Sequence, residues 1–131
     1  MTSEQLTEIL NMFRNVIPHY NYSYDKVGEL DLLTQDYLHK LELVDLPYNE
    51  RSKLATKLRK VRLERRKHKD IVERLEPLVK TVNKESKSLK SFEQTLGTMR
   101  KIEDRQQIRT YNPRVLDEDE FGEIMKEGEN E

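Results

Sequence analysis

The chain of 131 residues contains no cysteine, which excludes a disulfide framework and any chemistry that needs a thiolate. It contains no run of eighteen apolar residues, and no signal-peptide pattern opens it, so we expect a soluble intracellular protein. Its four glycines, Gly28, Gly97, Gly122 and Gly128, are scattered, and this excludes a glycine-rich phosphate loop. A phosphate would therefore have to be held by side chains.

Apolar residues are also scarce: 34% of the chain is hydrophobic and 37% is charged. An average globular chain is roughly 45–50% apolar, glycine included, and about 25% charged. At this length the chain can form one domain at most, and its supply of core is thin. The sequence predicts a mainly α fold of elongated antiparallel helices with a short C-terminal β-strand, whose core is completed by oligomerisation.

The apolar residues that are present recur at helical spacing. We expect a first helix, capped by Thr2 or Ser3, that ends at Pro18, and then a tyrosine-rich loop up to residue 28. A second helix should run from residue 25 or 29 to 44. A third should cover 48–76, with Pro77 kinking or ending it, and a fourth should follow a polar break at 83–88. The short connection at 45–47 favours antiparallel neighbours.

The net charge of −1 conceals a strong asymmetry along the chain. Residues 117–131 hold eight acidic residues and one lysine, so residues 1–116 carry a net charge of +6. We treat 1–116 as a single helical ligand-binding domain, in which 1–28 form the N-terminal helix and the tyrosine-rich loop. Residues 117–131 are expected to be an acidic, disordered tail.

Residues 51–70 concentrate positive charge, with ten Lys or Arg against one Glu and one Asp. A solvated helix face usually alternates in sign. Here a helix would align four cations in one stripe: Arg59, Arg62, Arg66 and Lys69. The same register places Arg65 and His68 at apolar seam positions, where an unpaired guanidinium would cost several kcal/mol. The seam should therefore be open at this point or filled by an anion.

The stretch IRTYNPRV, residues 108–115, cannot be helical around Pro113, and we expect it to be extended. In an extended segment Arg109 and Tyr111 point the same way. Arg114 follows the proline, so a short, stiff strand offers two guanidinium groups and a flat ring. That set suits a ligand with phosphates and an aromatic base. The alternative is a strand that pairs with a symmetry mate.

Catalytic and metal-binding patterns are weak. The sequence DYLH, residues 36–39, has the spacing of half a dimetal carboxylate site, and ERLE, residues 73–76, resembles half of the acidic motif of helical nucleotide pyrophosphatases. Neither has its second half in this chain. We therefore expect no enzyme activity, no catalytic residues, no metal and no cofactor.

Together, RKVRLERRKHKD in the third expected helix, RKIEDR at residues 100–105 and the pattern R-x-Y-x-P-R resemble the first-described phage Thoeris anti-defence proteins. The resemblance covers about residues 30–115. It implies a sponge in the cytoplasm of the infected bacterium, which binds a cyclic ADP-ribose isomer without degrading it and so blocks the Thoeris effector. Other cyclic nucleotides are further candidate ligands, and a homodimer or higher homo-oligomer is implied.

The resemblance also implies ligand-binding residues, but only at matching positions. The C-terminal motif contributes Arg109, Tyr111 and Arg114. The basic segment supplies candidates for the pyrophosphate, namely Arg62, Arg65, Arg66 and Lys69. Phe92 is a candidate platform for the base on helical spacing alone. The N-terminal helix and the acidic tail have no counterpart in the family.

Three other interpretations stay open. A small nucleic-acid-binding protein could use the basic helix at 51–70 against backbone phosphates, although the slightly acidic whole chain disfavours it. A helical adaptor or coiled-coil dimer would explain the apolar seam but not IRTYNPRV. A nucleotide-cleaving enzyme is the least favoured.

Overall fold

The computed structural model describes residues 1–111, 113–117 and 119–120. It contains three α-helices: α1 (Ser3–Leu43), α2 (Tyr48–Lys84) and α3 (Ser86–Gln107). The predicted mainly α class is confirmed. No strand occurs in the described ranges, so the expected C-terminal strand is not found there.

Helix α1 is continuous over 41 residues, and the predicted helix end at Pro18 and tyrosine-rich loop are both wrong. The helix begins at the predicted cap. The Thr2 hydroxyl accepts a hydrogen bond from the backbone N–H of Gln5 at 3.2 Å, and the Gln5 side-chain oxygen accepts one from the backbone N–H of Thr2 at 3.0 Å. A proline removes one helical hydrogen bond, and here the packing of α1 on α2 outweighs that loss. The alternating tyrosines also fit a helix, since Tyr20 and Tyr24 are one turn apart and stack at 6.0 Å between ring centroids.

Pro77 was predicted to kink or end the third helix, and because α2 runs through Pro77 to Lys84, it does not end the helix. Pro47 sits at its N-cap position, where a missing N–H is harmless. The expected polar break at 83–88 shrinks to a single residue, Glu85, between α2 and α3. The four expected helices are therefore three.

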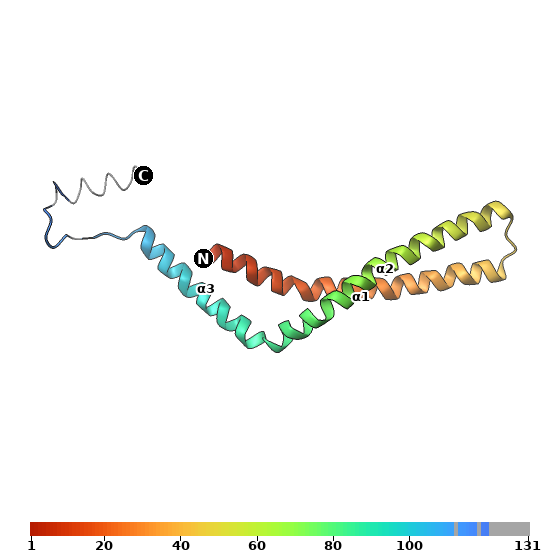
Figure 1. Cartoon of the computed structure of the whole chain (residues 1–131), viewed down its shortest axis with the longest axis horizontal. Coiled ribbons are helices and arrows are strands. Elements are labelled where there is room, and N and C mark those ends of the chain that lie inside the picture. Colours follow the sequence, from red (N-terminus) through yellow and green to blue (C-terminus); the bar gives the residue numbers. More distant parts are fainter. Residues whose placement is uncertain (112, 118, 121–131) are drawn as a thin grey trace. The chain divides into compact units, whose positions relative to one another are not determined.

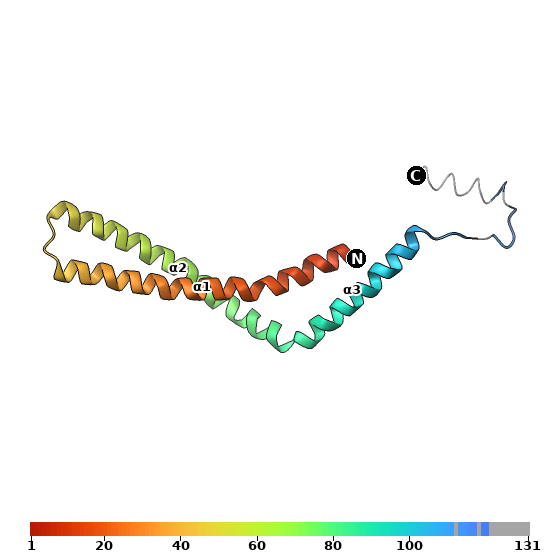
Figure 2. The same ribbon diagram turned by 180° about the vertical axis from the view of Figure 1, so that it is seen from behind.

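Helices α1 and α2 form an antiparallel hairpin joined by residues 44–47, as the short connection predicted (Figure 1). They lie side by side when seen from behind as well (Figure 2). Their interface is sparsely apolar, because the buried apolar side chains of the described residues are few: Leu6, Leu10, Leu54, Val82 and Leu96. Several polar side chains share the interior, among them Ser23 and Thr34. The thin core that composition predicted is thus present.

The chain divides into two units, Met1–Leu96 and Gly97–Glu131. The first unit contains α1, α2 and the beginning of α3, where Arg14 of α1 forms an ion pair with Glu93. The second contains the rest of α3 and the segment after it. Of the predicted acidic tail, residues 118 and 121–131 lie outside the described residues. None of the helices in the described part is both long and apolar enough to cross a membrane.

Candidate functional site

The predicted cationic stripe lies on α2, in the first unit. Arg59, Arg62 and Arg66 are exposed, and Lys69 is half-buried beside the interface with α1. Among the described residues, Arg59, Arg66 and Lys69 have no ion-pair partner. Within the part of the chain that the structure describes, the stripe therefore carries positive charge that no ion pair neutralises.

Arg65 lies at the seam between the helices, as its spacing predicted, with only 19% of its side chain exposed. Its Nε–H donates to the Asp31 carboxylate of α1. The Arg62 guanidinium approaches the same Asp31 oxygen at 3.8 Å. The Arg65 guanidinium therefore does not depend on a bound anion, because a carboxylate of the chain pairs with it at the seam. One carboxylate serves two guanidinium groups.

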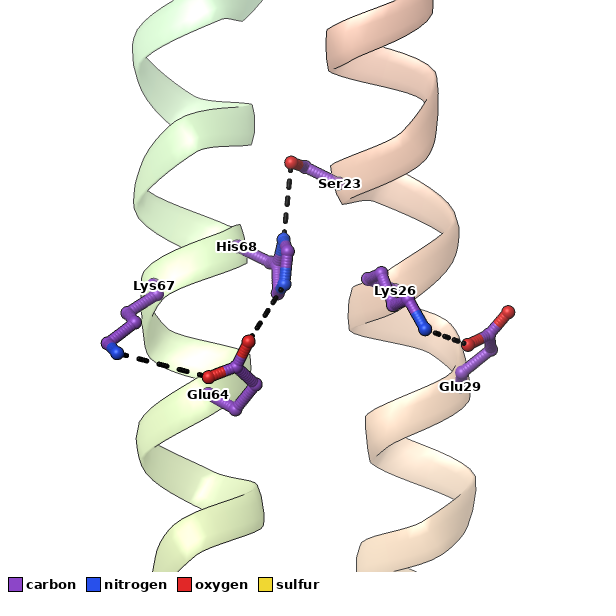
Figure 3. Close-up of polar contacts among 6 residues, drawn as sticks. All are labelled: Ser23, Lys26, Glu29, Glu64, Lys67 and His68. Atoms are coloured by element: carbon purple, nitrogen blue, oxygen red, sulfur yellow. Dashed lines mark hydrogen bonds and ion pairs between the residues drawn. The ribbon is translucent and has the colours of Figure 1, made fainter.

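His68, the second polar seam residue, connects the two helices (Figure 3). Its Nδ1 is 3.2 Å from the Ser23 hydroxyl of α1, and its Nε2 is 3.3 Å from the Glu64 carboxylate. Hydroxyl, imidazole and carboxylate follow one another as in a nucleophilic triad. However, Ser23 is 0% exposed between the helices, where no substrate could reach its oxygen. The chain of contacts instead satisfies the polar groups of His68 inside the interface.

Lys26 lies on α1, three residues after Ser23. It donates to Glu29 at 3.1 Å (Figure 3). Its ammonium also lies 5.8 Å from the Tyr22 ring centroid. The hydrogen bond to Glu29 and the charge of that carboxylate raise the pKa of Lys26 above its ordinary value of 10.5. Lys26 is thus firmly cationic at neutral pH.

A cavity of about 360 Å³ opens between α1 and α2 at the Arg65–Asp31 pair. Two of the predicted site residues, Arg65 and Lys69, line it. The remaining lining residues were not predicted from the sequence: Tyr24, Val27, Gly28, Asp31, Val72 and Glu73. The helical spacing of positions 24, 27, 28 and 31 could have indicated the α1 side of this cavity. It was not recognised because a loop was expected up to residue 28.

Phe92 lies elsewhere, on α3. It is 51% exposed and lines an apolar cavity of about 290 Å³ with Phe13 and Leu78. Arg65 and Lys69 do not line that cavity. The structure therefore does not bring the predicted base platform into the cavity of the cationic side chains.

Arg109, Tyr111 and Arg114 follow the end of α3 in the second unit, and all three are exposed. The segment around them is not helical, as Pro113 predicted. Asn112, between Tyr111 and Pro113, lies outside the described residues. As for metals, the described part of the chain contains no group of three His, Asp or Glu side chains that could hold an ion.

Comparison of the chain with protein-family models, with curated proteins and with solved structures finds no match in any of the three.

Proposed function

We propose that this protein binds and sequesters a cyclic ADP-ribose-type nucleotide signal without cleaving it, and so blocks activation of a Thoeris effector in a phage-infected bacterium. The cyclic ADP-ribose isomer comes from the sequence resemblance. The geometry supports the more general part of the proposal, which is retention of an anionic ligand by side chains.

The cationic face of α2 is the observation that carries the proposal. Arg59, Arg66 and Lys69 have no ion-pair partner among the described residues, while Asp31 is shared by two guanidinium groups. Guanidinium groups match phosphate oxygens with paired, charge-assisted hydrogen bonds. A pyrophosphate at this face would supply the missing negative charge.

The segment after α3, in the second unit, separately carries groups that suit a nucleotide. The exposed guanidinium groups of Arg109 and Arg114 can each pair with a phosphate, and the ring of Tyr111 offers a face for a purine. A sponge that holds its ligand tightly needs such contacts and needs no nucleophile. The burial of Ser23 supports retention over cleavage, because this hydroxyl beside an imidazole is out of reach of a ligand.

Isothermal titration with a cyclic ADP-ribose isomer tests the proposal, followed by heating and mass analysis of the released ligand. We expect tight binding and recovery of ligand of unchanged mass. A changed mass would make the protein an enzyme, and an absence of heat would discard the proposed ligand.

A matched pair of variants connects the binding to the cationic face. Arg66→Ala should weaken binding at least tenfold, since each charged hydrogen bond contributes about 1.5–3 kcal/mol. Lys60→Ala removes one positive charge from the opposite side of α2 and should bind like the parent. Equal effects of the two substitutions would mean that only net charge matters.

Nucleic-acid binding is the second candidate, and the length of the stripe favours it. Arg59 to Lys69 extends about 15 Å along the helix, enough to contact successive backbone phosphates. The nucleic-acid hypothesis predicts that the affinity for DNA or RNA falls steeply as the salt concentration rises. Binding titrations at low and at physiological salt would detect this fall.

A further inference from the structure

We propose that the cavity between α1 and α2 binds the sugar–phosphate part of a nucleotide, an inference that rests on the proposed function for the source of that nucleotide. The cavity lies wholly within the first unit, between two helices that pack directly on each other.

Helical spacing builds this cavity from both sides. Positions 24, 27, 28 and 31 recur on one face of α1, and positions 65, 69, 72 and 73 recur on the facing side of α2. Its volume of about 360 Å³ is at the lower end of the range for small-molecule sites, roughly 300–1,000 Å³. This volume suits one sugar–phosphate unit and not a whole dinucleotide.

The charges of the lining residues define the ligand class. Arg65 and Lys69 are cations that match a phosphate, whereas Asp31 and Glu73 are carboxylates that accept hydrogen bonds from hydroxyl groups. An inorganic phosphate would meet two repelling carboxylates, and a neutral sugar would leave the Lys69 ammonium without an anion among the described residues. A phosphate attached to a sugar with free hydroxyls satisfies both kinds of group.

Asp31 would compete with the ligand in this site, because its carboxylate already accepts a hydrogen bond from the Arg65 guanidinium. An entering phosphate competes with it for Arg65 and Arg62. The displaced carboxylate is then available to a sugar hydroxyl in the same cavity. Binding thus exchanges one anion for another at Arg65, and the buried guanidinium is never left without a partner.

Tyr24 extends the cavity outward. It is 61% exposed, stacks on Tyr20 and lines the cavity on the α1 side. An exposed ring beside a phosphate site offers a surface on which a base can stack, at about 1–3 kcal/mol per base. The base of the nucleotide is therefore placed on Tyr24, outside the enclosed volume.

A substitution at Gly28 can test the site without changing a charged residue. It lies in the middle of α1, and a Cβ added to it would meet no atom within 4 Å. A leucine at this position would project into the cavity without removing any charge, and leucine favours the helix over glycine. Gly97 in α3 is its control, since a Cβ there also meets open space and Gly97 lines none of the cavities described above.

The experiment titrates the parent protein, Gly28→Leu and Gly97→Leu with a cyclic ADP-ribose isomer and with adenosine monophosphate. We expect Gly28→Leu to bind at least tenfold more weakly than the parent and Gly97→Leu to bind as the parent does. If Gly28→Leu retains full affinity for the cyclic isomer, the cavity inference is wrong while the proposed function stands.

Adenosine monophosphate separates the two proposals. If the parent fails to bind the cyclic isomer but binds the monophosphate, and Gly28→Leu loses that binding, the proposed function fails and the cavity inference holds. If the parent binds neither, both are wrong.

A second pair of variants covers the case in which Gly28→Leu does not fold. Lys69→Gln neutralises a cation of the cavity wall, and Lys60→Gln makes the same change on the opposite side of α2. Weaker binding by Lys69→Gln alone supports the site. Equal affinity of the two variants overturns it.

Discussion

Asp31 of α1 accepts the Nε–H of Arg65 of α2 inside an interface that contains few apolar side chains. Because apolar packing specifies register weakly in so thin a core, we expect this half-buried ionic pair to help set how the two helices align. Such polar pairs are known to specify register at some cost in stability. Both residues line the cavity, Asp31 from α1 and Arg65 from α2, so the alignment of the helices and the shape of the site depend on each other.

Asp31→Ala should lower the free energy of unfolding by about 2 kcal/mol, because it leaves the largely buried Arg65 without its carboxylate. Urea denaturation measures the change. Asp36→Ala, which removes an exposed carboxylate five residues further along α1, should change stability by less than about 0.5 kcal/mol. The double variant Asp31→Ala, Arg65→Met should recover most of the loss, and a double variant as unstable as Asp31→Ala would contradict this account.

Pro18→Ala should raise the free energy of unfolding by about 2 kcal/mol. Proline in a helix interior costs about 3 kcal/mol relative to alanine, and part of that gain is offset because alanine leaves the unfolded chain more flexible. Thermal unfolding followed by circular dichroism measures the gain. Pro47→Ala serves as the control, since Pro47 lies at the N-cap of α2 and interrupts no helical hydrogen bond. A similar gain from both substitutions would argue against an uninterrupted α1.

The Lys26–Glu29 pair predicts a pH dependence at alkaline pH. Since the folded-state pKa of Lys26 is raised above 10.5, the pair contributes to stability below that pH and loses its contribution as pH rises through the raised pKa. Titration of the Lys26 side chain by NMR should show the raised pKa, and Glu29→Gln should return it toward 10.5. A pKa unaffected by Glu29→Gln would assign the shift to another cause.

Arg109→Ala should abolish retention of the cyclic ADP-ribose isomer while the helical circular dichroism stays unchanged, because Arg109 follows the last helix and is exposed. Isothermal titration measures the loss, to which the missing charged hydrogen bond alone contributes about tenfold or more. Lys101→Ala removes an exposed cation within α3 and should retain binding. Full retention by Arg109→Ala would remove that residue from the site.

The helical class, the antiparallel pairing of residues before and after 44–47, and the seam positions of Arg65 and His68 could all be predicted from the sequence. Each depends on a local property: apolar spacing, a short connection or the register of one helix. The same local reasoning was wrong at Pro18, because the cost of a proline is local while the packing that outweighs it comes from a distant segment. A helix that ends at Pro18 contains no residue beyond it, so this prediction could not include the face of α1 that carries Tyr24, Gly28 and Asp31.

The sequence by itself therefore determined the chemical inventory: a basic helix, a few aromatic rings, no thiol and scarce apolar residues. Only the tertiary structure decided which of these groups meet. It placed Asp31 against Arg65 and Ser23 against His68, pairs that are 34 and 45 residues apart in the chain. The physical reason is that a charge has no preferred partner along the sequence, and its partner is set by how two helices align across a thin core.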